Sequence, residues 1–156
     1  MSRYLLDTHT LIWWLNGSPQ LPQPIRAGLD QAELIHVSAA SITDAYHLTR
    51  KRRDGLTMEQ WRALVDQLLD WPDDLIPLEL EPITADVALL AALFREMTGI
   101  TDPADLYLAA TAARLRLPLV SRDEELASWD GLGGVLEVRW ESPTATSTWA
   151  WPTSTR

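Results

Sequence analysis

Short apolar runs and longer stretches with helical spacing alternate along this chain. The short runs, which are typical of strands buried on both faces, lie at 4–6, 34–37, 75–78, 118–120 and 135–138. The stretches between them have apolar residues three or four positions apart and predict helices at 11–15, 24–32, 41–53, 57–70, 84–97, 102–117 and 124–129. Because parallel strands need long crossovers that cover both faces of a sheet, this order predicts the α/β class, as a three-layer α/β/α sandwich with a central, mostly parallel sheet.

Individual residues predict where several of these elements begin and end. Thr57 and Gln60 have the spacing of a capping box, and Gly99 ends the strongly apolar helix before it. Asp102, followed by Pro103, has the pattern of a helix cap. Pro77 has no backbone N–H to donate, so it predicts that the strand 75–78 lies at an edge of the sheet.

The chain is long enough for one domain. It has 156 residues, of which 46% are hydrophobic, and this is too short for two ordinary domains. We expect that domain to span 1–140, and the segment 141–156, rich in Ser, Thr, Pro and Trp without a period, to be an irregular C-terminal tail. Neither a signal peptide nor a stretch of membrane-spanning length is found, so a cytoplasmic protein without a membrane role is expected.

Composition limits the chemistry. With no cysteine, the chain has no disulfides, thiolate ligands or thiol nucleophile. A formal net charge of -9 disfavours broad binding to nucleic acid, which depends on Lys and Arg. Carboxylates gathered around divalent cations would reverse the sign of charge that a phosphate meets locally.

Four aspartates fall where a ligand is expected. Ligands of open α/β sheets bind beyond the carboxyl ends of the strands, and Asp7 and Asp123 each follow a predicted strand there. Asp44 and Asp105 lie near the starts of helices, so all four can converge at one edge of the sheet. Clustered carboxylates resist joint ionisation unless a cation is present, and oxygen-only ligation suits Mg²⁺ or Mn²⁺. Such a site could hydrolyse a phosphodiester bond with metal-activated water.

Each aspartate also has a purely structural interpretation. Asp102 and Asp123 could cap the helices that they precede, and Asp44 could be a solvent-facing helix residue. Asp105 could complete an Asp-x-x-Asp cap with Asp102, but it shares a helical stripe with the apolar side of its helix, where an unpaired carboxylate is costly. Asp7, at the end of a buried strand, is the hardest to explain as structure alone.

Four segments together resemble the PIN-domain family, and most of all the toxins of VapBC-type toxin–antitoxin pairs. They are the runs at 5–14, 37–44, 102–112 and 117–126, in the order and spacing of that family, and the likeness covers 4–140. The resemblance implies a Mg²⁺- or Mn²⁺-dependent endoribonuclease toxin that acts on RNA. It also implies a homodimer that is silenced by a cognate VapB-like antitoxin.

The resemblance carries over residue by residue. Asp7, Asp44, Asp105 and Asp123 match the family's four acids, which implies a catalytic and metal-binding role for each, with Thr8 and Ser121 as neighbouring hydroxyls. Asp44 stands where the family usually has Glu, and its shorter side chain reaches less far. The alternative function is therefore a catalytically weakened PIN-like module that acts through protein or RNA binding.

Two further groups have more than one interpretation. The basic run 50–53 could clamp RNA phosphates or could simply complement the carboxyl end of a helix. Trp13 and Trp14 are adjacent in a predicted helix, so we expect one in the core and the other on a dimer or antitoxin surface.

Overall fold

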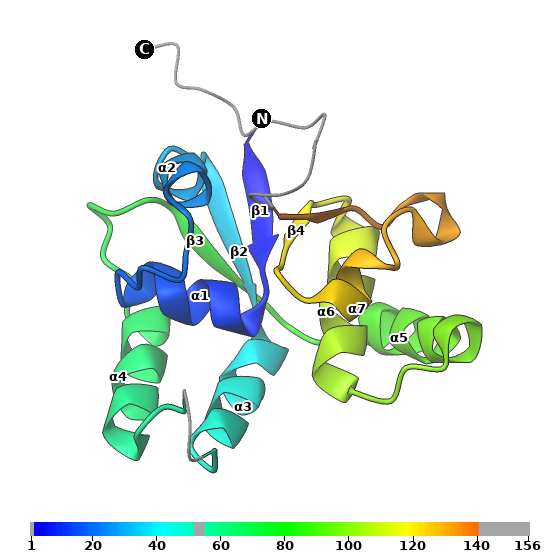
Figure 1. Cartoon of the computed structure of the whole chain (residues 1–156), viewed down its shortest axis with the longest axis horizontal. Coiled ribbons are helices and arrows are strands. Elements are labelled where there is room, and N and C mark those ends of the chain that lie inside the picture. The colour runs from blue at the N-terminus through cyan, green and yellow to red at the C-terminus, as the bar shows by residue number, and fades with distance from the viewer. Residues whose placement is uncertain (1, 52–54, 141–156) are drawn as a thin grey trace.

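The computed structural model describes residues 2–51 and 55–140 and shows an all-parallel sheet of five strands (Figure 1). The strand order is β3-β2-β1-β4-β5, and every neighbouring pair is parallel. The strands are β1 (Arg3–Leu6), β2 (Leu34–Ser38), β3 (Leu78–Glu81), β4 (Leu119–Val120) and β5 (Val138–Arg139). The predicted tail at 141–156 lies outside the described residues.

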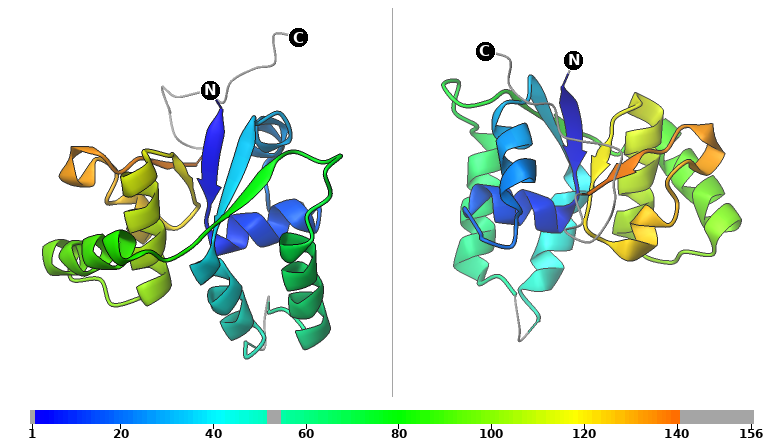
Figure 2. Two further views of the ribbon diagram at one scale, coloured as in Figure 1. Left: turned by 180° about the vertical axis from the view of Figure 1, so that it is seen from behind. Right: turned by 45° about the horizontal axis from the view of Figure 1, so that its top comes forward.

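Helices cover both faces of this sheet, which confirms the predicted three-layer α/β/α architecture (Figure 2). The helices are α1 (Thr8–Leu15), α2 (Gln23–Asp30), α3 (Ala39–Leu48), α4 (Met58–Leu69), α5 (Ala85–Thr98), α6 (Pro103–Leu115) and α7 (Glu124–Ala127), with a short 3₁₀ turn η1 (Leu132–Gly134). None of the described helices combines the length and apolar character needed to cross a bilayer.

Two hydrophobic cores lie on opposite faces of the sheet. In β1, Tyr4 and Leu6 pack into the core shared with α1, α2 and α4, whereas Leu5 packs into the core shared with α5 and α6. Successive side chains of a strand point to opposite faces, so a strand covered on both sides is apolar at most positions. This explains why the buried strands appear in the sequence as continuous apolar runs.

The predicted capping signals are confirmed. The Thr57 hydroxyl accepts from the backbone N–H of Gln60 at 3.1 Å, and the Gln60 side chain accepts from the N–H of Thr57 at 2.8 Å. Gly99 ends α5 in the left-handed region at φ 75°, where glycine meets no steric penalty. The carboxylate of Asp102 caps α6.

The structure corrects the predicted bounds of two strands. The third strand is Leu78–Glu81 rather than 75–78: the Pro77 carbonyl accepts from the N–H of Ile35 at 2.9 Å, and the pairing with β2 continues from Leu78 onward. It is an edge strand, as Pro77 predicted. The last strand is Val138–Arg139 rather than 135–138, because the N–H of Val135 donates within the preceding turn to Leu132.

Two helices also differ from their predicted bounds. The helix expected at 11–15 begins at Thr8, directly after its cap Asp7. The helix expected at 41–53 begins earlier, at Ala39, and ends at Leu48. The Ser38 side chain accepts from the N–H of Ala40 at 3.1 Å and caps it. Of the basic run, Arg50 and Lys51 therefore follow the helix, and positions 52 and 53 lie outside the described residues.

Candidate active site

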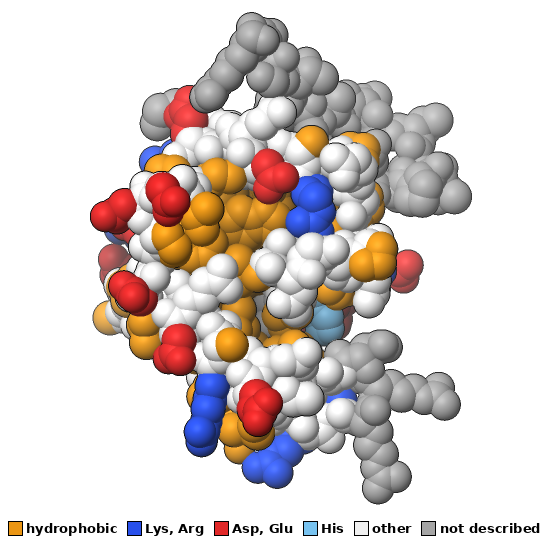
Figure 3. Space-filling model, turned by 90° about the vertical axis from the view of Figure 1, so that its left-hand side faces the viewer, with side chains coloured by type: hydrophobic (Ala, Val, Ile, Leu, Met, Phe, Trp, Pro, Cys, Tyr) orange, Lys and Arg blue, Asp and Glu red, His pale blue; other side chains and the backbone are white. Residues whose placement is uncertain are grey.

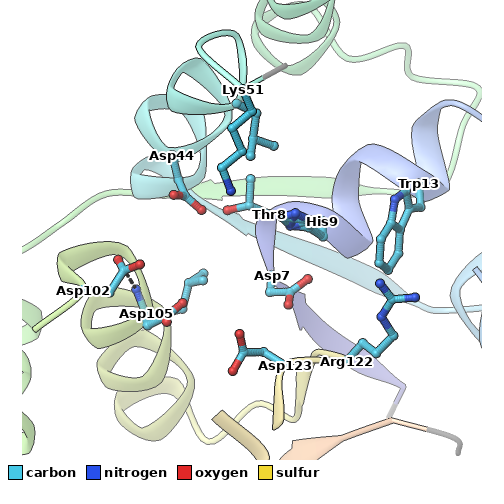
Figure 4. Close-up of a pocket in the computed structure, with 12 residues that line it drawn as sticks. Asp7, Thr8, His9, Trp13, Asp44, Lys51, Asp102, Asp105, Arg122 and Asp123 are labelled. Carbon is cyan, nitrogen blue, oxygen red and sulfur yellow. Dashed lines mark hydrogen bonds between the residues drawn. The ribbon is translucent and has the colours of Figure 1, made fainter. Parts of the chain in front are cut away.

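A pocket of about 320 Å³ opens at the carboxyl ends of β1 and β4, and all four predicted aspartates line it (Figure 4). Asp7 lies between β1 and α1, Asp44 in α3, Asp105 in the first turn of α6, and Asp123 between β4 and α7. Asp102 lines the same pocket. Four segments that are far apart in the sequence thus bring five carboxylates to one edge of the sheet.

Asp7 is the most buried of these carboxylates, with 8% of its surface exposed. One carboxylate oxygen accepts from the backbone N–H of Thr10 at 2.8 Å and so caps α1. The other accepts from the hydroxyl of Ser121 at 2.5 Å. Burial raises the pKa of Asp7, and the hydrogen bonds from Ser121 and Thr10 oppose that rise. Asp7 therefore has both a structural role as a cap and a fixed place in the pocket.

Asp105 experiences the combined charge of the pocket. Its pKa is raised from 3.8 to about 7, first by burial and then by the negative charges of Asp102, Asp123, Asp44 and Asp7. Asp105 is half-buried, as the apolar stripe of its helix predicted. Burial is the larger cause and the like charges add to it, so a cation bound in this pocket would lower the pKa of Asp105 again.

Asp102 and Asp123 both cap helices while they line the pocket. One oxygen of Asp102 accepts from the backbone N–H groups of Ala104 at 2.9 Å and Asp105 at 3.4 Å. One oxygen of Asp123 accepts from the N–H of Leu126 at 3.0 Å. Among the described residues, the second oxygen of each carboxylate accepts no hydrogen bond. The capping interpretation is thus confirmed for both, and each keeps an oxygen available to a ligand.

Among the described residues, no three of the predicted aspartates have carboxylate oxygens within 4.8 Å of one another. In the described ranges, a different set, His36, Glu79 and Glu81, is the one whose ligand atoms lie within 4.8 Å of one another. These residues come from β2 and β3, and none of them lines the carboxylate pocket.

The His36 group was not predicted, although the alternation of Leu and Glu in Leu78–Glu81 places both glutamates on one face of that strand. Its spacing suits a metal ion, but its hydrogen bonds already occupy the ring. The Nδ1 atom of His36 lies 2.7 Å from Glu81, and its Nε2 atom lies 3.0 Å from the guanidinium of Arg3. We interpret the group as a hydrogen-bonded network of the sheet.

Among the described residues, Lys51 and Arg122 are the cations that border the carboxylate pocket. The Lys51 side chain extends from the end of α3 toward Asp44 and Thr8 (Figure 4). Arg122 lies between Ser121 and Asp123, with its guanidinium 4.5 Å from the centre of the Trp13 ring. The sequence analysis placed Lys51 only within the basic run and did not single out Arg122. The position of Arg122 in the loop that follows a strand could have identified it as a residue of the site.

The two adjacent tryptophans have different surroundings. Trp13 is buried, as predicted for one of the pair, and packs edge-on against Trp140. Trp14 is half-buried; its indole N–H donates to Asp30 at 2.9 Å and its ring stacks on Trp71. Trp61, in α4, donates to the carbonyl of Ile42 in α3 at 2.9 Å, so it joins the two helices.

Comparisons with known proteins agree with this geometry. The family model of the PIN domain matches residues 4–132. A chain of VapBC-5 from Mycobacterium tuberculosis, a member of the VapBC family of toxin–antitoxin systems, is 19% identical with a TM-score of 0.57, and the match covers 88% of this chain and 98% of that one. A comparison with curated proteins finds no match.

Two further solved structures share the fold. A chain of the DNA-bound VapBC from Salmonella typhimurium is 17% identical, with a TM-score of 0.61 and coverage of 89% of this chain and 98% of that one. A chain of FitAcB from Neisseria gonorrhoeae is 23% identical, with a TM-score of 0.56 and coverage of 86% and 95%.

Proposed function

The chain belongs to the PIN domain family, and on that basis we propose that it is a Mg²⁺- or Mn²⁺-dependent endoribonuclease, the toxin of a toxin–antitoxin pair, acting on RNA in the cytoplasm. One observation carries the proposal: Asp7, Asp44, Asp105 and Asp123 line one pocket, where burial, together with the negative charges of the neighbouring carboxylates, raises the pKa of Asp105. A pocket of this kind binds a divalent cation and, beside it, a phosphate.

The residues of the pocket fit a hard divalent cation. Every candidate ligand is a carboxylate oxygen, the donor that Mg²⁺ and Mn²⁺ prefer, and Asp7 is already held in place by Thr10 and Ser121. When bound, such a cation would activate water and offset the charge that develops on the leaving oxygen. Asp105 would lose its proton on binding, since the charge of the cation would offset the burial and the repulsion that raise its pKa.

The chain's own cations complement this arrangement. Lys51 and Arg122 lie at the border of an otherwise acidic pocket, where they can contact the phosphates on either side of the bond to be cleaved. The acidic groups alone would repel RNA. Binding of the substrate should therefore depend on the divalent cation as well as on these two side chains.

A protein partner is also part of the proposal. The structures of similar fold from Mycobacterium tuberculosis and Salmonella typhimurium are named as VapBC, and we expect a VapB-like antitoxin here and a homodimer of this chain. On the face that carries α4, hydrophobic side chains gather around a hollow (Figure 3). A groove of about 110 Å³ between α1 and α4, lined by Ile12, Leu15, Leu56 and Leu64, suits an apolar segment of such a partner.

The decisive experiment is cleavage of single-stranded RNA by the purified chain with Mg²⁺, with Mn²⁺ and with EDTA. The Asp7→Asn variant removes one charge, and Asn remains a good helix cap, so the fold should persist. Asp66→Asn, an exposed carboxylate of α4 outside the pocket, is the matched control. We expect metal-dependent cleavage by the wild type and the control and none by Asp7→Asn. Cleavage that persists in EDTA would contradict the proposal.

The wide spacing of the aspartates favours a second candidate function, a PIN-like module that binds RNA or protein but cleaves weakly. A titration with Mn²⁺ that is followed by thermal melting separates the two. A cation that binds the folded state raises the melting temperature by mass action. No rise in the wild type would favour the module.

A further inference from the structure

A second cavity, of about 580 Å³, continues from the carboxylate pocket along the gap between α3 and α6. The two cavities share Asp44, Leu48, Lys51 and Asp102 in their linings. The residues that line only the second cavity include Ala40, Thr43, His47, Ile83, Pro103 and Tyr107, and we call it the side pocket. A chain-like ligand held at the carboxylates would extend into it.

The lining of the side pocket suits a flat, partly polar group. Tyr107 is half-buried, and His47 is exposed, so the pocket has two aromatic side chains. The hydroxyls of Thr43, Thr101 and Tyr107 have no hydrogen-bond partner within the described ranges and could donate or accept. Aromatic rings with a few polar groups are how proteins hold single bases, and the volume is typical of a small-ligand pocket.

Lys51 marks the boundary between the two cavities. It is the only lysine in the sequence, and it contributes to both linings. An ammonium at this boundary can contact the phosphate that joins the nucleotide at the carboxylates to its neighbour. The neighbour's base would then lie on the side-pocket side of that phosphate.

We propose that the side pocket receives one unpaired nucleobase of the RNA, next to the phosphodiester held at the four aspartates, with Tyr107 and Thr43 in contact with it. This inference rests on the proposed ribonuclease function. A paired base is already stacked in its duplex, so the pocket selects single-stranded segments. The exposed hydroxyls and the free oxygen of Asp102 would then set which base is preferred.

Binding of two fluorescent RNA hexamers, measured with Ca²⁺ in place of Mg²⁺, tests the inference. One hexamer is intact, and the other lacks bases but keeps the same phosphates. Thr43→Trp fills the side pocket from an exposed position of α3, and Tyr107→Ala removes an aromatic wall. Each should raise the Kd of the intact hexamer about tenfold, the size expected for one lost base–aromatic contact, and leave the Kd of the abasic hexamer unchanged.

Leu75→Ala is the matched control, because Leu75 is 47% exposed and lies outside the side pocket, and it should change neither Kd. Thermal melting shows that each variant is folded. Equal binding of the two hexamers by the wild type, or unchanged binding by both variants, would overturn the side-pocket assignment. That result could occur while RNA is still cleaved. Conversely, selective binding of the intact hexamer without any cleavage would support the side-pocket assignment and contradict the proposed ribonuclease function.

Discussion

Ser121 links the carboxylate of Asp7 to the backbone of Asp123 at the candidate site. Its hydroxyl donates to Asp7 at 2.5 Å, and its oxygen accepts from the backbone N–H of Asp123 at 3.0 Å. Since Ser121 is fully buried, neither bond is replaced by water if the hydroxyl is removed. A residue that the resemblance marked only as a neighbour thus positions both an acid and the loop that carries another.

We predict that Ser121→Ala weakens both the fold and the metal site. The loss of a buried hydrogen bond costs about 1 kcal/mol, or about 2–4 °C in melting temperature. The pKa of Asp7 should rise further, because the Ser121 bond opposes the effect of burial. The Mn²⁺-induced rise in melting temperature should therefore appear at higher pH than in the wild type. An unchanged pH dependence would show that Asp7 does not contact the cation.

The length of the side chain at position 44 should determine how closely its carboxylate approaches a bound cation. It is half-buried in α3 and lines the pocket, yet it belongs to no set of three ligands within 4.8 Å among the described residues. Glutamate would keep the charge and extend the carboxylate by one methylene. The same change tests whether the spacing limits binding of the cation.

We predict that Asp44→Glu tightens Mn²⁺ binding by a factor on the order of 10, the lower end of the effects of changing groups around a metal. Calorimetric titration measures the change directly. Asp66→Glu, which makes the same substitution on an exposed part of α4, should leave the affinity unchanged. Equal or weaker binding by Asp44→Glu would mean that Asp44 already contacts the ion in its best geometry.

At the scale of elements, helix caps supply much of the local order of this fold. Thr57 and Gln60 satisfy two backbone N–H groups at the start of α4, and this helix packs Leu64 and Leu68 into the core that it shares with α1 and α2. A cap is a local interaction, so its removal should affect stability without affecting the distant pocket.

We predict that Thr57→Ala lowers the free energy of unfolding by about 1 kcal/mol, as is typical for a lost cap, and the melting temperature by about 2–4 °C. Urea unfolding gives this value. Thr57→Ser keeps the hydroxyl and should be close to the wild type. RNA cleavage should be unaffected in both variants, and a loss of cleavage would show that α4 is coupled to the site.

The sequence predicted local elements better than their exact pairing. Residues 4–6, 34–37 and 118–120 were identifiable as strands because both faces are buried, and Asp7 could be placed by the rule on strand ends. The third strand was wrong by three residues, since the alternation Leu–Glu–Leu–Glu belongs to an edge strand whose glutamates lie beside His36 of β2. The side pocket depends on how α3 and α6 approach each other, which no local pattern encodes.

At the scale of the whole molecule, charge is the dominant feature. The formal net charge is -9, and one pocket concentrates five of the carboxylates. Clustered charge of one sign destabilises the folded chain, because unfolding separates the groups. The site therefore reduces stability in the absence of a cation, as functional sites commonly do.

This cost should be visible in the pH dependence of stability. The folded chain holds the Asp105 proton up to a pKa of about 7, whereas the unfolded chain releases it near 3.8. The folded state then binds more protons in this window, so this group lowers the stability of the metal-free protein as pH rises from about 4 to about 7. The partial exposure of Asp105 reduces the effect through solvent screening.

We predict that, in EDTA, Asp105→Asn melts at a higher temperature than the wild type at pH 8, by on the order of 2–4 °C, and that the difference disappears near pH 4. Mn²⁺ should reverse the order at pH 8, because it stabilises only the protein that can bind it. Asp66→Asn removes a charge outside the pocket and should follow the wild type throughout. If the variant and the wild type melted in parallel at every pH, the repulsion at Asp105 would be relieved by rearrangement of the chain, and the pocket would not need a cation to be stable.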